Sequence, residues 1–244
     1  SQAGHRIRFM SMTNGGTGHY RIGGGELIRR RWEEAKRSAA LIGADYLILD
    51  IPNNGLEPHL YLRWRLIEII REFKADIVIT HRPNDYHPDH RYTSLLVQDT
   101  STAINNPNVC PLTPPLKRNP LYLYMMDNFL RPYPFQPDLV FDIEPVIEKK
   151  MEMLHQHTSQ VYEWLPWEQG RLKEVPLDVK ARKKWLKKWF HERERSILIE
   201  RLRPALIKKY GDLRGKQIKY AEAFEFSEYG SSYYRDKIKR FFKF

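Results

Sequence analysis

The stretch Asp76–His90, which reads DIVITHRPNDYHPDH, joins a short apolar run to a polar turn rich in histidine and aspartate. The run Ile77–Thr80 has the length and the β-branched composition of a buried parallel strand. In open α/β sheets, ligands bind beyond the carboxyl ends of the strands, so the polar residues after Thr80 are candidates for a functional site. The stretch therefore predicts an α/β fold and the place of its chemistry.

The polar turn allows two interpretations. Histidine and aspartate at this close spacing suit a divalent ion, zinc first, or acid–base chemistry. The same residues also suit the start of a helix, because Asp89 would lie near its N-terminus and Pro88 in its first turn. The chemistry of the residues leaves both interpretations open.

Around this stretch, apolar runs of strand length alternate with segments of helical periodicity, separated by short turns. The predicted strands are 7–12, 46–50, 77–80, 121–125, 139–143 and 221–226, and the predicted helices are 26–42, 59–73, 88–103, 145–161 and 179–203. The early order β–α–β–α–β is typical of right-handed crossovers that build a parallel sheet. We therefore predict a Rossmann-like, doubly wound, mostly parallel sheet flanked by helices, in an α/β domain with a basic helical C-terminal elaboration.

The chain has 244 residues, shows no internal repeat or clear linker, and is long enough for one large domain spanning 1–244. Its single cysteine, Cys110, excludes an intrachain disulfide and a cysteine-built zinc site. No apolar run approaches the roughly 20 residues needed to span a bilayer, and the first residues do not resemble a signal peptide. Composition favours a cytoplasmic protein without excluding export, and it leaves the oligomeric state unknown.

Positive charge is concentrated in the last third of the chain. From Arg171 onward there are 22 Lys and Arg against 10 Asp and Glu, whereas residues 1–170 hold 19 against 20. Such asymmetry marks either a nucleic-acid-binding surface or, more commonly, a solvated helical face. We expect no nucleic-acid partner. The stripe Trp185, Leu186, Trp189 and Phe190 is expected to pack on the domain, with membrane docking as the alternative. The basic elaboration is placed at 170–215.

A glycine-rich turn, Thr13–His19, follows the first predicted strand. Such turns can cradle phosphate groups, but the GxGxxG spacing of dinucleotide-binding loops is absent, so this indication is weak.

The segment Thr80–Arg91 resembles the HPDH signature of the PIG-L-like (LmbE-like) N-deacetylases. Four further motifs agree in order and spacing: the strand into Thr13-Asn14-Gly15, Arg31-x-x-Glu34 with the helix end at Gly43, Leu154-x-x-His157-x-Ser159-Gln160, and Tyr220–Phe224. Together they cover most of the chain.

The resemblance implies a zinc-dependent hydrolase that removes an acetyl group from an N-acetylated amino sugar or glycoconjugate. It implies that His90 is a metal ligand and that His87 and Asp89 are catalytic, with Asp89 orienting the ring of His87. It further implies substrate contacts at Arg31, Asp85 and Tyr86.

The sequence departs from the family at one signature. The HPDD string, which provides two metal ligands and the general base in the family, does not occur in these 244 residues. The resemblance places it on a strand upstream of residue 1, so we expect a longer native chain and little hydrolysis by the 244 residues alone. Two other functions stay open: a non-catalytic carbohydrate-binding or scaffold protein on the same fold, and a nucleic-acid binder that uses the basic tail.

Overall fold

The structure, a computed structural model, describes residues 4–194, 196–235 and 237–242. The described chain forms two compact units, each built from two separate stretches. Unit 1 combines Ser1–Gly55 with Asp142–Ala221, and unit 2 combines Leu56–Phe141 with Glu222–Phe244. A single domain over residues 1–244 stays a prediction.

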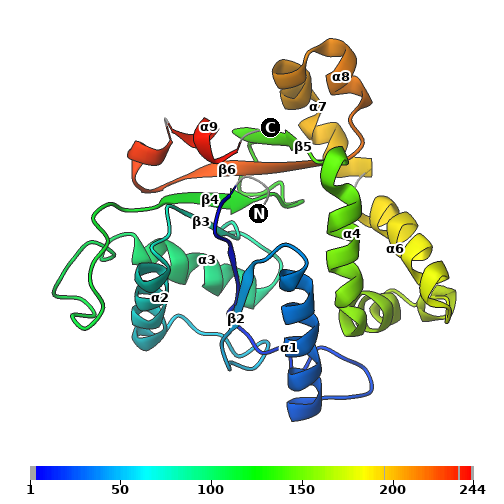
Figure 1. Cartoon of the computed structure of the whole chain (residues 1–244), viewed down its shortest axis with the longest axis horizontal. Helices are drawn as coiled ribbons and strands as arrows, with labels where there is room; N and C mark the ends of the chain where they lie inside the picture. The colour runs from blue at the N-terminus through cyan, green and yellow to red at the C-terminus, as the bar shows by residue number, and fades with distance from the viewer. Residues whose placement is uncertain (1–3, 195, 236, 243–244) are drawn as a thin grey trace. The chain divides into compact units, whose positions relative to one another are not determined.

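Unit 1 begins with two parallel strands joined by a helix (Figure 1). These are β1 (Arg8–Ser11), α1 (Gly24–Ala40) and β2 (Asp45–Ile48). The strands pair from Arg8 opposite Asp45 to Ser11 opposite Ile48. The parallel pairing with a helical crossover is the one that the alternating sequence pattern predicts.

The rest of unit 1 is helical. Its elements are η1 (Glu144–Val146), α4 (Ile147–Gln156), the π-helical turn η2 (Ser159–Trp164), α5 (Leu165–Glu168), η3 (Leu172–Glu174), α6 (Val179–Glu194), α7 (Ser196–Tyr210) and α8 (Asp212–Gln217). The predicted helix 179–203 is therefore two helices, and residue 195 between them lies outside the described residues.

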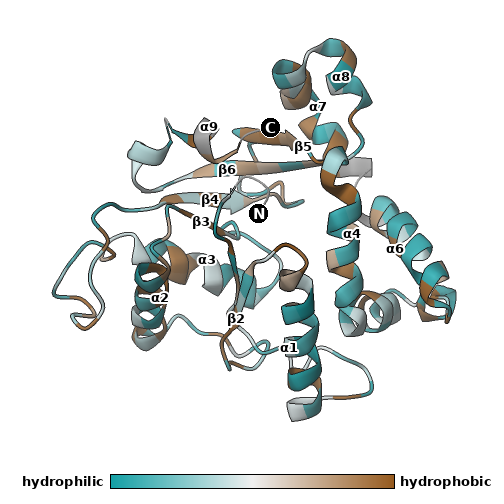
Figure 2. Cartoon of the chain, in the orientation of Figure 1, coloured by the Kyte–Doolittle hydropathy of each residue, from teal (hydrophilic) through white to brown (hydrophobic). Residues whose placement is uncertain are grey.

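The aromatic stripe of α6 packs inward, as the sequence predicts. Leu186, Trp189 and Phe190 are buried, and Trp185 packs against the cluster that Leu186 and Trp189 form with Val161 and Tyr162. The other residues of the helix are mostly hydrophilic (Figure 2). The apolar side thus packs within unit 1, while the lysines of the helix are exposed.

Unit 2 contains a mixed sheet with the strand order β3-β4-β6-β5. Its elements are α2 (Leu60–Phe73), β3 (Ile77–Thr80), α3 (Pro88–Thr100), β4 (Leu121–Met125), β5 (Leu139–Asp142), β6 (Ala221–Gly230), η4 (Ser232–Tyr234) and α9 (Ile238–Phe241). The strands β3 and β4 are parallel, whereas β6 runs antiparallel to β4 (Figure 1). The α/β class is confirmed. The antiparallel β6 makes this sheet mixed; a sequence periodicity of two indicates a strand but does not give its direction.

Side chains on both faces of β3 pack against apolar neighbours, although Ile79 is 42% exposed. Val78 packs with Ile67 and Ile70 of α2, whereas Ile77 packs with Leu121 and Ile238. Successive side chains of a strand point to opposite faces, so neighbouring positions must both be apolar here.

The long connection between α3 and β4 is held by a buried arginine. Arg71 on α2 is 2% exposed, and its guanidinium donates hydrogen bonds to six main-chain carbonyls. The acceptors are Ala103, Ile104, Asn106, Val109, Cys110 and Thr113. One side chain thus organises a connection that has no regular secondary structure of its own. Within the described ranges, no helix is long and apolar enough to cross a membrane.

Candidate active site

The candidate site lies where β3 ends and α3 begins, on unit 2. His87 is the N-cap residue of α3, Pro88 occupies its first turn, and the main-chain N–H of Asp89 donates to Nδ1 of His87 at 3.2 Å. This hydrogen bond satisfies one of the amides that every helix start leaves without an intrahelical partner. The capping interpretation is therefore confirmed, with His87 as the capping residue, and it does not compete with a chemical role.

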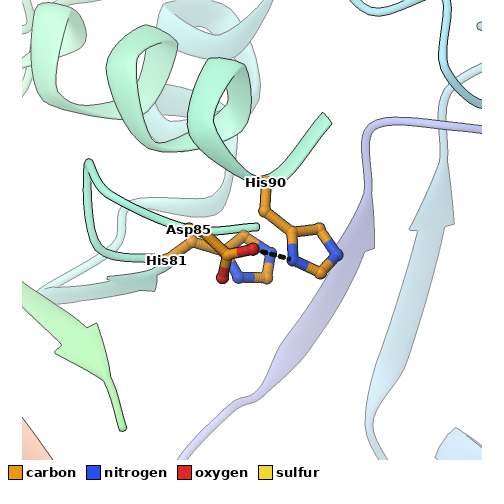
Figure 3. Close-up of side chains that lie close together, drawn as sticks. All are labelled: His81, Asp85 and His90. Carbon is orange, nitrogen blue, oxygen red and sulfur yellow. Dashed lines mark hydrogen bonds and ion pairs between the residues drawn. The ribbon is translucent and has the colours of Figure 1, made fainter. Parts of the chain in front are cut away.

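Three side chains of this loop lie together and can offer ligand atoms to a cation (Figure 3). One such atom from each of His81, Asp85 and His90 lies within 4.8 Å of the others. Oδ1 of Asp85 is 2.9 Å from Nδ1 of His90, and the rings of His81 and His90 stack 4.1 Å apart at 3°. Two imidazoles and a carboxylate are donors that zinc accepts.

A second buried arginine anchors the loop. Arg82 is 1% exposed and donates to Oδ1 of Asp127 at 3.0 Å and to the carbonyl of Tyr133 at 2.8 Å. Its Nε lies 3.7 Å from a carboxylate oxygen of Glu225. The hydroxyl of Ser94 also donates to the carbonyl of His81 at 2.7 Å. These contacts fix the main chain that carries the histidines without using their ring nitrogens.

The charges around the loop favour a cation. The side chains of four carboxylates are between 8% and 13% exposed, namely Asp85, Asp89, Asp127 and Glu225. Two guanidinium groups accompany them, those of Arg82 and Arg91. With neutral histidines, the group carries a net charge of −2, and a divalent ion would neutralise it.

Burial shifts two pKa values in this region. The pKa of His81 falls to about 4, first because of burial and then because of the neighbouring His90. Burial raises the pKa of Asp127, although the charge of Arg82 opposes the rise. His81 is therefore neutral at pH 7, which is the form of imidazole that binds metal ions.

The fit of a metal ion can be judged from the polar atoms. Oδ2 of Asp127 is buried and has no hydrogen-bond partner among the described residues. A buried carboxylate oxygen without a partner is costly, and a nearby cation would offset part of this cost. The donor set and the net charge both fit a divalent ion.

The structure brings five of the six predicted site residues together. Asp85, Tyr86, His87 and His90 share contacts, and Asp89 adds its carboxylate beside His87. Tyr86 is 70% exposed, and its ring stands edge-on to the rings of both histidines. The carboxylate of Asp89 is 3.8 Å from Nδ1 of His87. At this distance it does not hydrogen-bond the ring, so the main chain of Asp89 orients His87 in its place.

The sixth residue, Arg31, belongs to unit 1. Its guanidinium donates to the carbonyl of Gly15 at 3.0 Å and to that of Gly18. A Cβ on Gly15 would lie 2.6 Å from Cδ of Arg31, and one on Gly18 would lie 2.9 Å from Nη1. The glycine-rich turn thus wraps around an arginine, which accounts for these glycines without a phosphate ligand.

The motif residues Glu34 and Ser159 form a buried network in unit 1. Glu34 is 1% exposed and accepts hydrogen bonds from the main-chain N–H of Ser159 at 2.9 Å, from its hydroxyl at 2.7 Å and from the hydroxyl of Thr158 at 2.7 Å. The Arg31-x-x-Glu34 helix and the His157-x-Ser159 segment are therefore joined by a carboxylate.

Three residues of the site were not among the predicted site residues: His81, Arg82 and Asp127. His81 lay within the quoted stretch, so its proximity to the HPDH string was an available signal. Asp127 follows β4, whose carboxyl end meets that of the parallel β3 at the same sheet edge. Only tertiary packing identifies Arg82 as buried.

Comparison with known proteins bears on the family. The PIG-L family model, described as GlcNAc-PI de-N-acetylase, matches residues 1–101. The diacetylchitobiose deacetylase of Thermococcus kodakarensis is 28% identical over 180 residues. That match covers 69% of this chain and 65% of the relative, so the chain spans slightly less than two thirds of its length.

Solved structures agree on the fold. The N,N'-diacetylchitobiose deacetylase of Pyrococcus horikoshii superposes with a TM-score of 0.64 at 22% identity, covering 93% of this chain and 74% of that one. The 4-carboxy-2-hydroxymuconate hydratase of Pseudomonas putida gives 0.67 at 17% identity, covering 92% and 85%. At such identities the likeness concerns the fold alone. The resemblance to the PIG-L family that the sequence motifs predict is thus confirmed, with the family match on residues 1–101.

Proposed function

We propose that the protein is a zinc-dependent N-deacetylase that hydrolyses the acetamido group of an N-acetylated amino sugar or glycoconjugate. The observation that carries the proposal is the loop after β3, where His87 and His90 lie beside four carboxylates and two guanidinium groups whose net charge is −2. The similarity to diacetylchitobiose deacetylases supports the choice of substrate class.

In this proposal His90 is a ligand of the ion, while the ring of His81 stacks on it and Asp85 contacts its Nδ1. A bound zinc ion supplies a Lewis acid for the acetyl carbonyl and lowers the pKa of a water molecule. His87 faces the developing oxyanion or protonates the leaving amine, and Asp89 holds its ring through the main-chain N–H.

The substrate would contact three further residues. Tyr86 offers an exposed ring face beside both histidines, which suits the apolar face of a pyranose ring. Asp85 still has its Oδ2 for a polar contact, because its Oδ1 is used by His87 and His90. Arg31 is also a proposed substrate contact. It would use the guanidinium N–H groups that do not donate to the carbonyls of Gly15 and Gly18.

The test is an N-deacetylase assay of the full-length protein on N,N'-diacetylchitobiose, with zinc content measured on the same sample. We expect acetate release, loss of activity on chelation and recovery on addition of zinc. His90→Ala should lose both zinc and activity, whereas His59→Ala, on a side chain that is 53% exposed, should keep both. Zinc and activity retained in His90→Ala would refute the proposal, and sugar binding without hydrolysis would favour a carbohydrate-binding protein.

A further inference from the structure

We propose that the loop after β3 holds His87 and His90 in opposite neutral tautomers. His87 then presents an N–H from its Nε2, and His90 presents a lone pair from its Nε2. The inference rests on the proposed function, because it assigns the atoms through which the two residues would act.

The tautomer of His87 follows from the helix cap. The main-chain N–H of Asp89 points at Nδ1 of His87, 3.2 Å away. An amide N–H can only donate, so Nδ1 must accept and carries no proton. A neutral imidazole has one ring proton, and it must therefore lie on Nε2. The side chain is 27% exposed, so this N–H can meet a substrate.

The tautomer of His90 follows from Asp85. Nδ1 of His90 lies 2.9 Å from Oδ1 of Asp85. The carboxylate oxygen can only accept, so Nδ1 carries a proton. In the neutral ring this is the single ring proton, and Nε2 then has the lone pair. Figure 3 shows Nδ1 turned toward Asp85 and the other ring nitrogen turned away. Histidine ligands commonly donate their second ring N–H to a carboxylate in this way.

Asp85 is thus a positioning residue for both histidines. Its Oδ1 also accepts the main-chain N–H of His87 at 3.0 Å, and its side chain is only 9% exposed. The stacked ring of His81, 4.1 Å away at 3°, limits rotation of the His90 ring. One buried oxygen therefore sets the tautomer of His90 and ties down the helix start that sets the tautomer of His87.

Opposite tautomers divide the chemistry between the two residues. A general acid must hold a proton on the atom that faces the substrate, whereas a metal ligand must have none on the atom that faces the ion. With the tautomers exchanged, Nε2 of His87 would be bare and Nε2 of His90 protonated. Neither residue would then fill its role without rearrangement.

The test is long-range ¹H–¹⁵N NMR on the full-length protein with ¹⁵N-labelled histidine at pH 8, where an unperturbed histidine is neutral. The variants His87→Gln and His90→Gln assign the two rings. We expect a protonated Nε2 for His87 and a protonated Nδ1 for His90. On addition of zinc, Nε2 of His90 should shift while its Nδ1 stays protonated. The opposite form of either ring, averaged nitrogen shifts, or zinc at Nδ1 of His90 would overturn the inference.

Substitution of Asp85 separates orientation from direct metal binding. Asp85→Asn keeps an amide oxygen that can accept from His90, whereas Asp85→Ala does not. We expect Asp85→Asn to keep the tautomer and near-parent zinc affinity, and Asp85→Ala to lose the fixed tautomer and weaken zinc binding by about 10- to 100-fold. Asp99→Ala, which removes a partly exposed carboxylate paired with Arg63 on the same unit, should change neither.

Equal loss of zinc in Asp85→Asn and Asp85→Ala would show that Asp85 binds the ion itself, and it would overturn the positioning role. The NMR measurement needs no substrate, so the tautomers and the proposed deacetylase function can be refuted independently of each other. The expected tautomers without acetate release would contradict only the proposed function, whereas deacetylation with other tautomers would contradict only this inference.

Discussion

Replacement of Arg71 by methionine tests whether one buried guanidinium holds the connection between α3 and β4. Arg71 is 2% exposed, and its six carbonyl acceptors lie at 2.6–3.2 Å. None of these acceptors is a carboxylate, so the guanidinium donates these hydrogen bonds to main-chain dipoles. Methionine keeps much of the apolar stem and removes every donor.

The expected loss follows from the hydrogen bonds. A hydrogen bond contributes a net ~0.5–1.5 kcal/mol, so six would sum to roughly 3–9 kcal/mol. Five of the acceptor contacts are only partly buried, and water can reach those carbonyls after the change. We therefore expect Arg71→Met to lower the free energy of unfolding by about 3–5 kcal/mol. Lysine has three donors, so Arg71→Lys should lose about half as much.

Urea unfolding followed by circular dichroism measures the loss, and hydrogen exchange localises it. Amides between residues 103 and 113 should exchange faster in Arg71→Met than in the parent. The matched control is Arg65→Met on the same helix, because Arg65 is 46% exposed and pairs with Glu68 at the surface. It should cost less than about 0.5 kcal/mol. A loss below about 1 kcal/mol in Arg71→Met, or no difference between Arg71→Lys and Arg71→Met, would refute the reasoning.

Three further predictions concern the site, the glycine-rich turn and pH. His87→Ala should lower kcat by about 10²-fold or more with little change in KM, because an acid acts in the transition state; a dominant rise in KM would indicate substrate positioning. Gly15→Ala should lower the free energy of unfolding in urea by about 2–3 kcal/mol, because the φ of Gly15 is +80° and a Cβ there would contact Arg31. Gly43→Ala is the control: its φ is +64° but the space around it is open, so it should cost about 1 kcal/mol. Equal losses would contradict the clash with Arg31. Burial lowers the pKa of His157 below its ordinary 6.5. In acid the unfolded chain therefore binds more protons than the folded chain, and the free energy of unfolding should fall as pH drops below 6.5. Unfolding measured at several pH values should show a smaller acid-side slope for His157→Gln, and an unchanged slope would contradict the assignment.

The sequence by itself determined the parts of this protein that depend on short-range patterns. The apolar run before His81 and the periodicity of α1, α2 and α3 located the helices and strands within a few residues. Proline and aspartate after His87 marked the start of α3, because helix starts depend on local capping chemistry. The HPDH string pointed to the family that residues 1–101 match.

Tertiary structure alone decided which polar groups meet. Asp127 and Glu225 lie beside Arg82 although they are far from it in the chain, and Arg71 reaches carbonyls more than thirty residues away. Asp85 and His90 are close in the sequence, but only the folded loop determines that Asp85 contacts Nδ1 of His90 and not Nε2. Hydrogen-bond partners, burial and charge balance depend on how distant segments pack, and a linear pattern carries no distances between such segments.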